Sequence, residues 1–539
     1  MYMETFMALT SFNFLVFLAV VIVLYYLVPK KFQWVWLLIV SYAFYLYSGI
    51  GQVFFLLGTT IVTYGSGLLM QKRRDRYKAE LASDPSMDRE KKQELKKKTG
   101  KDIHKIQVLT VVLDLVVLAV VKYSGFAIKN INDILKSLGS ESAIPGLKII
   151  VPLGISFYTF MAMGYIIDIG RGKYEAEKNP AKLALFLSFF PSIVQGPISR
   201  YDDVGKKLVE QHKINYENLT YGAQLIMFGF FKKLVIADRV APVVTQIFSV
   251  KMFDKLSGTT MFFGMLCYAV QIYCDFSGGI DITRGVAQMM GIELPLNFER
   301  PYFSTSVAEY WRRWHITLGA WMREYVFYPI MLSKPMSKLS KKVKEKHGQK
   351  ASKYVPSVIT PFIVFILIGI WHGANWRYVA FGLYNAVIVA GSVALEPLFT
   401  KWAEKLHIKT DSKGWKVFKI IRTFLILGIS KILVKAASLK MAVKTIFKIF
   451  TSFNLAFGSE MVKYGFDLGY KNNIVLGLAV LFLFIISILQ ENGIKIRQSV
   501  GKWFIVFRWI AYFVLLIIIL VFGIYGPEYD AANFIYQTY

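Results

Sequence analysis

Two of the six histidines stand in apolar, aromatic surroundings, where an imidazole can take part in proton transfer. His372 lies between Trp371 and Gly373, and His315 directly follows Trp314. A neutral imidazole accepts a proton near physiological pH, and burial favours this neutral form. Catalysis and hydrogen-bonded packing are both open for these two. The other four histidines lie in basic polar segments and are expected to be solvated: His104, His212, His347 and His407.

Two arginines between two tryptophans precede His315, in the order Trp311, Arg312, Arg313 and Trp314. Arginine side chains bind phosphate groups and stack on aromatic rings, so this strip could hold an anionic substrate. The same composition is typical of an interfacial belt, in which Trp and Arg lie at the lipid headgroups. The residues alone leave both interpretations open. No cluster of side chains has the spacing of a metal site.

Ionisable residues also interrupt the apolar segments, where a charge is costly and needs a partner or a function. Asp114 lies in the middle of such a segment with no evident partner, so either a functional or a helix-packing role is open. The charges expected to anchor a segment, form ion pairs or reach the headgroups are Asp168, Lys232, Lys233, Asp238 and Arg239.

The elements that must position these residues are apolar stretches of 17–25 residues, which recur along the whole chain and predict membrane-spanning helices. Two further segments, 181–197 and 316–332, are broken by Pro or charge and predict re-entrant or interfacial helices. The sequence therefore predicts an all-α polytopic membrane protein with about 11–12 transmembrane helices in one integral-membrane domain over 1–539. The predicted spans lie near 11–28, 34–50, 52–70, 106–122, 148–169, 218–238, 259–276, 357–376, 378–396, 417–436, 472–490 and 504–525.

The 64 Lys and Arg residues exceed the 35 Asp and Glu residues by 29. With 55% apolar and only 18% charged residues, this excess does not indicate a soluble nucleic-acid-binding protein. Segments 71–106 and 334–353 are especially basic and predict cytoplasmic loops, which puts the N-terminus outside. Span 417–436 contains Lys431 and Lys435, so it is short, tilted or buried in protein. Cys267 and Cys274, about 10 Å apart along a helix, are expected to be reduced core residues.

Several motifs, in their order and spacing, resemble the membrane-bound O-acyltransferase (MBOAT) family over roughly residues 10–400. The resemblance is to its bacterial branch of alginate and peptidoglycan (PatA-type) acetylation proteins, with the teichoic-acid D-alanylation proteins (DltB) as shorter relatives. Helices at about 410–525 favour the acetylation proteins. The matching segments are VPLGISF at 151–157, FPS at 190–192, GPISRY at 196–201, FKK at 231–233, IAD at 236–238, DFSG at 275–278, Asp281, PLNF at 295–298, PY at 301–302, YWRRWH at 310–315, Trp321, REY at 323–325 and WHG at 371–373.

The resemblance implies an MBOAT fold and an acyltransferase with His372 as its catalytic histidine and His315 as the second. The enzyme would move an acyl group, acetyl above all, from a cytoplasmic thioester across the bacterial cell membrane to a surface polysaccharide. His372 would act as general base. The residues expected to bind or orient substrate are Trp311, Arg312, Arg313, Trp371, Asp281 and Asn375.

No permanently bound cofactor or metal is expected. The donor would be acetyl coenzyme A or the phosphopantetheine thioester of an acyl carrier protein, docked on the basic segments 71–106 and 334–353. The resemblance also implies an exported SGNH-hydrolase-like partner that completes transfer to the glycan. The chain departs from the alginate-type pattern at Arg323-Glu324-Tyr325, where Arg-Asp-Tyr is usual, and in the lysine-rich insert that follows.

Three other functions are open at this point. One is D-alanyl transfer to teichoic acid. Another is a transporter of lipid-linked glycans, whose buried charges would line a pathway; paired broken helices in repeated halves, common in transporters, are not evident in this sequence. The third is a non-catalytic scaffold that recruits an exported acetyltransferase.

Overall fold

The computed structural model describes residues 8–140, 142–147, 149–454, 457–466 and 468–525. Over these ranges the regular structure is helical, and extended backbone pairs only in an isolated antiparallel bridge between Phe298 and Trp314. The prediction of an all-α protein is confirmed. Cys267 and Cys274 are free thiols in the buried core, as expected.

Each of the twelve predicted spans falls on a helix. Within the described residues, seven helical segments are long and apolar enough to cross a membrane, fewer than the 11–12 expected. The remaining predicted spans lie on helices that are shorter (α1, α2 and α5) or interrupted by charges (α10 and α16). The seven are α3 (Ile50–Ser83), α4 (Arg89–Ser137), α8 to α9 (Tyr216–Ile247), α14 (Lys334–His372), α15 (Trp376–Lys405), α19 (Tyr470–Glu491) and α21 (Ile505–Phe522).

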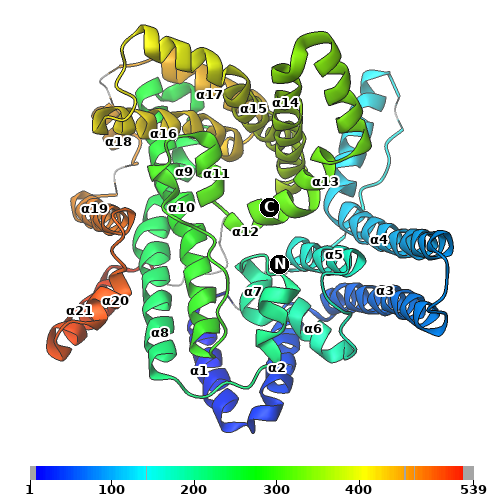
Figure 1. Cartoon of the computed structure of the whole chain (residues 1–539). Coiled ribbons are helices and arrows are strands. Elements are labelled where there is room, and N and C mark those ends of the chain that lie inside the picture. The colour runs from blue at the N-terminus through cyan, green and yellow to red at the C-terminus, as the bar shows by residue number, and fades with distance from the viewer. Residues whose placement is uncertain (1–7, 141, 148, 455–456, 467, 526–539) are drawn as a thin grey trace. The chain divides into compact units, whose positions relative to one another are not determined.

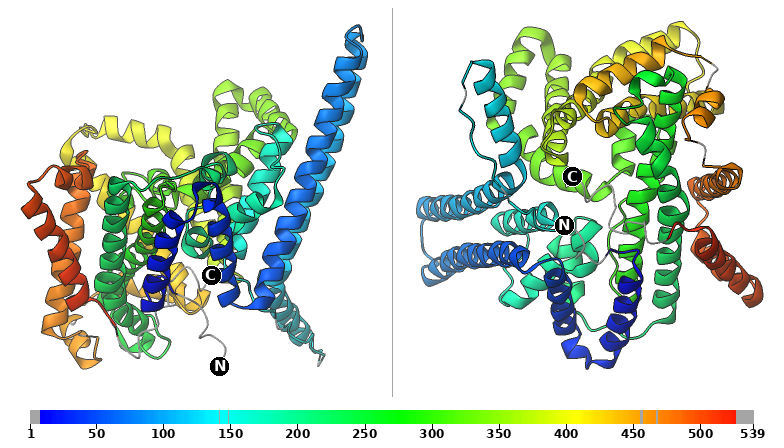
Figure 2. Two further views of the ribbon diagram at one scale, coloured as in Figure 1. Left: turned by 90° about the horizontal axis from the view of Figure 1, so that it is seen from below. Right: turned by 180° about the vertical axis from the view of Figure 1, so that it is seen from behind.

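The chain divides into two compact units, which we describe separately. Unit 1 comprises residues 1–223 and 283–295. Its long helices α3 and α4 lie side by side (Figures 1 and 2). The predicted re-entrant segment 181–197 forms two short helices, α6 and α7. The other helices of unit 1 are α1 (Phe12–Leu27), η1 (Lys30–Phe32), α2 (Gln33–Tyr47), α5 (Ile155–Arg171), α6 (Pro180–Ser188), α7 (Phe190–Gln195), η2 (Tyr201–Gly205) and η3 (Lys207–Val209).

Unit 2 comprises residues 224–282 and 296–539 and contains both candidate histidines. Helices α8 (Tyr216–Phe230) and α10 (Gly258–Met289) have residues in both units. That the units make up one integral-membrane domain stays a prediction. The other helices of unit 2 are η4 (Phe231–Ala237), α9 (Asp238–Ile247), η5 (Phe253–Lys255), η6 (Pro301–Phe303), α11 (Val307–Arg313), α12 (Ile316–Met322), η7 (Arg323–Phe327), α13 (Tyr328–Met331), α16 (Lys413–Lys435), α17 (Leu439–Thr451), α18 (Phe457–Lys463) and α20 (Ile496–Gly501).

The basic segments, predicted to be cytoplasmic loops, are helical over most of their length. That they lie on the cytoplasmic side stays a prediction. In segment 71–106, α3 continues to Ser83 and α4 begins at Arg89, which leaves a turn of a few residues. Segment 334–353 is the first half of α14, with a break in helical geometry at Gly348. Lys and Arg are good helix formers, so a basic composition extends an apolar helix into water rather than ending it.

Helices α14 and α15 pack closely because two glycines face each other across them. A Cβ atom on Gly369 would lie 2.5 Å from the carbonyl oxygen of Tyr378 and 2.8 Å from Cα of Gly382. The backbone of α15 therefore occupies the space beside Gly369. This contact fixes the end of α14, where His372 lies.

A methyl group at Gly369 should therefore destabilise unit 2. We expect Gly369→Ala to lower the free energy of unfolding by about 1–3 kcal/mol, because the backbone of α15 must move away. The control is Gly391→Ala, also on a helix but with open space around its Cβ position. That change should be neutral or stabilising by up to about 1 kcal/mol. Thermal unfolding in detergent measures both; equal melting temperatures would contradict the close contact.

Candidate active site

His315 is held in place by a polar hub at Asn297. The bridge between Phe298 and Trp314 places the two chain segments side by side. The side-chain oxygen of Asn297 then lies 3.2 Å from His315 Nδ1, 3.1 Å from the backbone nitrogen of Thr317 and 2.9 Å from Thr317 Oγ1. Asn297, His315 and Thr317 are all buried. This hub orients the imidazole ring within the protein interior.

The hub also fixes which nitrogen of His315 carries the proton. A backbone N–H only donates, so the Asn297 atom that Thr317 contacts must be the carbonyl oxygen. The Nδ1 atom of His315 contacts the same oxygen and must therefore be the protonated nitrogen. In the neutral ring, Nε2 is then the unprotonated nitrogen and can accept a proton or a hydrogen bond.

The surroundings of His315 favour this neutral form. The Phe276 ring meets the imidazole edge to face at 4.9 Å, and the Trp371 ring lies 6.1 Å away. Burial, with a smaller effect of the nearby His372, holds the pKa of His315 well below its usual range. His315 also has a φ of 47°, in the left-handed region. Such backbone strain in a residue other than glycine is often found at functional sites.

His372 is the last residue of α14 and is half-buried among aromatic rings. The centroid of its ring lies 4.9 Å from Trp371 and 5.3 Å from Phe381, both in edge-to-face geometry. Trp371 contacts both histidines, because its ring also lies near His315. The two histidines are 57 residues apart in sequence but are brought to one aromatic cluster.

Both histidines line a cavity of about 290 Å³. Two arginines, Arg312 and Arg323, also line it, and Arg312 is exposed. The rest of its lining is chiefly apolar, from α11, α12, α14 and α15. A pocket of mixed apolar lining with a few convergent polar groups is the usual form of a small-molecule site. The arginines could hold an anionic part of the substrate while the histidines face its reactive end.

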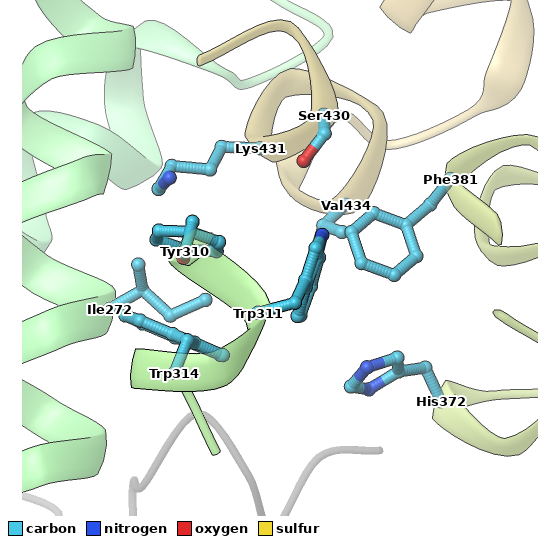
Figure 3. Close-up of a pocket in the computed structure, with 9 residues that line it drawn as sticks. All are labelled: Ile272, Tyr310, Trp311, Trp314, His372, Phe381, Ser430, Lys431 and Val434. Atoms are coloured by element: carbon cyan, nitrogen blue, oxygen red, sulfur yellow. The ribbon is translucent and has the colours of Figure 1, made fainter. Parts of the chain in front are cut away.

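Trp311 stands between this cavity and a second, smaller one of about 40 Å³. Its indole nitrogen donates a hydrogen bond to Asn385 at 3.3 Å, and its ring contacts Phe365 and Phe381. Figure 3 shows the Trp311 ring between Lys431 and His372. The residues that line both cavities are Trp311, Trp314 and His372. His372 therefore has access to two spaces in unit 2.

The predicted substrate-binding residues divide into two groups. Trp311 and Arg312 line the larger cavity, and Trp371 contacts both histidines. Arg313 instead forms ion pairs with Glu309 at 2.7 Å and Glu491 at 2.9 Å. Its guanidinium is committed to these carboxylates, so the geometry gives no support to a substrate contact.

Asn375 and Asp281 also have contacts that a structural role explains. The Asn375 side chain accepts a hydrogen bond from the backbone nitrogen of Arg377 and so caps α15. The carboxylate of Asp281 lies 2.7 Å from Lys232 Nζ, and both side chains are largely buried. The described contacts of these two residues do not include either histidine. The sequence could not distinguish these roles from catalytic orientation.

Lys233, another buried charge of unit 2, is paired as expected. Lys233 lies 2.7 Å from Asp275 and 2.8 Å from Asp238. Lys232 also donates to Ser277 at 2.9 Å. These lysines lie on η4, a π-helical turn between α8 and α9, which directs both toward α10. In unit 1, Asp168 pairs with Arg171, Lys173 and Arg200, and Asp114 is buried in α4.

We expect Asp281→Asn to lower the free energy of unfolding rather than kcat. Breaking a buried ion pair leaves an uncompensated ammonium on Lys232 and costs about 3–5 kcal/mol. The matched control is Asp203→Asn, which breaks an exposed pair with Lys207 worth about 0–1 kcal/mol. Thermal unfolding in detergent should show a large loss for Asp281→Asn only. A fall in kcat at unchanged melting temperature would instead assign Asp281 to the reaction.

Sequence reasoning missed two residues of the site, Asn297 and Lys431. Asn297 belongs to a segment that resembles the family, but no residue pattern indicated that its oxygen would orient His315. Lys431 was noted only as an interruption of span 417–436. It is 5% exposed and lines the smaller cavity, so of the three explanations, burial in protein is confirmed.

Comparison with known proteins shows the family of the chain. The model of the membrane-bound O-acyltransferase family matches residues 177–345. The chain belongs to this family and is a multi-pass membrane acyltransferase.

Among its relatives is the probable alginate O-acetylase AlgI of Pseudomonas aeruginosa, which is 30% identical over 79% of this chain and 71% of its own length. The peptidoglycan O-acetyltransferase of Helicobacter pylori is 28% identical over 63% of each chain. The teichoic acid D-alanyltransferase of Bacillus subtilis is 30% identical over 52% of this chain and 67% of its own length. The family identifies an acyltransferase, so the transporter and scaffold alternatives are set aside.

Proposed function

We propose that this acyltransferase moves an acetyl group from a thioester donor to a hydroxyl group of a cell-surface polysaccharide. The observation that carries the proposal is the shared cavity, in which His372 and His315 face a space also lined by two arginines. The names of the acetylating relatives support the acetyl group and the polysaccharide acceptor.

In the proposed reaction His372 is the general base. It takes the proton from the acceptor hydroxyl as the oxygen attacks the thioester carbonyl, and the carbon–sulfur bond breaks as the new ester bond forms. The proton then passes to the departing thiolate, which leaves as a thiol. His315, with Nε2 unprotonated, accepts a hydrogen bond within the site and positions the donor or assists this proton transfer.

The donor is proposed to be acetyl coenzyme A or the acetylated phosphopantetheine of a carrier protein. Both carry phosphate, which suits Arg312 and Arg323 at the larger cavity. The basic halves of α3, α4 and α14 are proposed to face the cytoplasm and to attract either donor. The protein is proposed to lie in the bacterial plasma membrane and to act with an exported SGNH-hydrolase-like partner.

The experiment uses the purified full-length protein together with its exported partner, radiolabelled acetyl coenzyme A or acetyl carrier protein as donor, and a polysaccharide oligomer as acceptor. We expect thiol release from one donor, with label in the oligomer, and loss of both in His372→Ala. Thiol release that His372→Ala leaves at the wild-type rate would overturn the proposal.

The second candidate function is D-alanyl transfer to teichoic acid, favoured by the relative of that name in Bacillus subtilis. Its chemistry at His372 would be the same, but its donor would carry a D-alanyl group on a carrier protein. Faster thiol release from D-alanyl carrier protein than from either acetyl donor would favour this candidate over the first.

A further inference from the structure

The two chain segments that hold His315 are joined beside the isolated antiparallel bridge as well. There the backbone nitrogen of Glu299 donates to the carbonyl oxygen of Arg313 at 2.9 Å. Each segment also contains one residue in the left-handed region, because Arg300 and His315 both have a φ of 47°. Residues other than glycine keep such a conformation only where their surroundings hold them in it. The two segments therefore need contacts that fix them firmly to each other.

One carboxylate, that of Glu491, binds an arginine from each segment. It lies 2.8 Å from Nε of Arg300, and it accepts hydrogen bonds from Nη1 and Nη2 of Arg313 at 2.9 and 3.2 Å. A two-point contact between a guanidinium and a carboxylate fixes the geometry of both groups. The three side chains are only 18–22% exposed, so water screens their charges in part. We call these three residues the carboxylate clamp.

Glu491 is the last residue of α19, which is distant in sequence from both segments. It is 191 residues from Arg300 and 178 residues from Arg313. A second contact places α19 against the same region, because Phe484 stacks on Phe303 of η6 with ring centroids 5.8 Å apart. The clamp therefore fastens the backbone around the candidate site to a helix that is long and apolar enough to cross a membrane.

We propose that Glu491 is a positioning residue for acetyl transfer, which holds His315 in its catalytic orientation through the two arginines. The inference rests on the proposed function, in which His315 positions the donor or assists proton transfer. The described contacts of Glu491 include neither histidine, so its effect passes through the spacing of the two segments. That spacing sets the contact between Asn297 and Nδ1 of His315. Without the carboxylate the two guanidiniums would repel each other, and the contact would loosen.

The test compares Glu491→Gln with Glu460→Gln in the full-length protein together with its exported partner. Glu460 is a matched control, because its carboxylate also ties a C-terminal helix, α18, to a distant segment. It accepts hydrogen bonds from the backbone nitrogen and the hydroxyl of Ser257, both at 2.9 Å. Both changes should lower the melting temperature. Only Glu491→Gln should lower kcat, by about 10–100-fold, while KM for the donor stays near the wild-type value.

A double-mutant cycle separates positioning from a general loss of stability. If Glu491 acts through the hub at Asn297, adding Glu491→Gln to Asn297→Ala should lower kcat little further. Losses that multiply would overturn the proposal, as would wild-type kcat in folded Glu491→Gln. Glu491→Asp should recover part of kcat, because it restores the charge on a side chain one methylene shorter. If Glu491→Gln does not fold, Arg300→Gln removes one arm of the clamp and takes its place in the cycle.

A second readout does not depend on catalysis. In protein with isotope-labelled histidine, the nitrogen chemical shifts of His315 report which ring nitrogen carries the proton, and His315→Gln assigns these signals. We expect protonated Nδ1 in the wild type and in Glu460→Gln, and a mixture of both neutral forms in Glu491→Gln. Unchanged His315 signals in Glu491→Gln would overturn the proposal. If the wild type cleaves no acetyl donor, the proposed function ends, and these spectra alone decide whether Glu491 orients the ring.

Discussion

Replacing His372 with alanine is expected to reduce acetyl transfer by about 10²–10⁴-fold, the range that removal of a general base usually produces. The loss should fall on kcat, because a base that acts on the acceptor hydroxyl contributes little to donor binding. His372→Gln keeps a polar side chain of similar reach but has no basic nitrogen, so it should be nearly as inactive. Steady-state kinetics with separately varied donor and acceptor measure this division.

The matched control is His347→Ala. His347 lies on the same helix, α14, in its exposed basic half. Its loss should leave kcat unchanged. Melting temperatures of all three variants in detergent must stay near that of the wild type for the comparison to hold. A folded His372→Ala enzyme with more than a tenth of wild-type kcat would remove His372 from the chemistry.

The second large effect is expected at Asn297. Replacing it with alanine removes the oxygen that accepts hydrogen bonds from His315 Nδ1 and from the backbone and hydroxyl of Thr317. Each buried donor left without an acceptor costs about 1–3 kcal/mol, so the melting temperature should fall. The imidazole also loses the contact that fixes its tautomer, and a misplaced catalytic group can lower the rate about 10²-fold.

Asn297→Asp distinguishes the two effects, because its carboxylate restores an acceptor for Nδ1 while adding a negative charge. That charge should raise the pKa of His315, so the pH profile of kcat for Asn297→Asp should differ from that of the wild type. Asn492→Ala, at the exposed end of α19, is the control and should change neither property. Wild-type kcat in a folded Asn297→Ala enzyme would contradict a positioning role.

The apolar stretches were enough to place a helix at each predicted span, because a helix that lies in lipid is apolar over most of its length. They did not show which helices cross the membrane, since seven helical segments among the described residues are long and apolar enough to do so. The apolar pattern did not predict the ends of α3, α4 and α14. Outside the membrane a helix need not be apolar, so its end is not marked by a change in hydrophobicity. The predicted re-entrant segment 316–332 proved to be α12, a π-helical turn and α13 in succession.

The candidate site was predicted in part. His315 and His372 stood out because an imidazole is unusual in such apolar surroundings. The roles of Arg313 and Asp281 depend on Glu491 and Lys232, which are 178 and 49 residues away in sequence, and such pairings follow from tertiary packing alone. The same is true of Lys431, whose place beside Trp311 is set by the packing of α16 on α11.

Transfer across a membrane tests the proposed function most directly. The full-length protein is reconstituted in vesicles, with labelled acetyl donor enclosed on one side and polysaccharide acceptor, together with the exported partner, on the other. We expect label in the acceptor with wild-type protein, none with His372→Ala, and donor thiol retained on its own side. Label that reaches the acceptor at the same rate with His372→Ala would show that His372 does not catalyse the transfer.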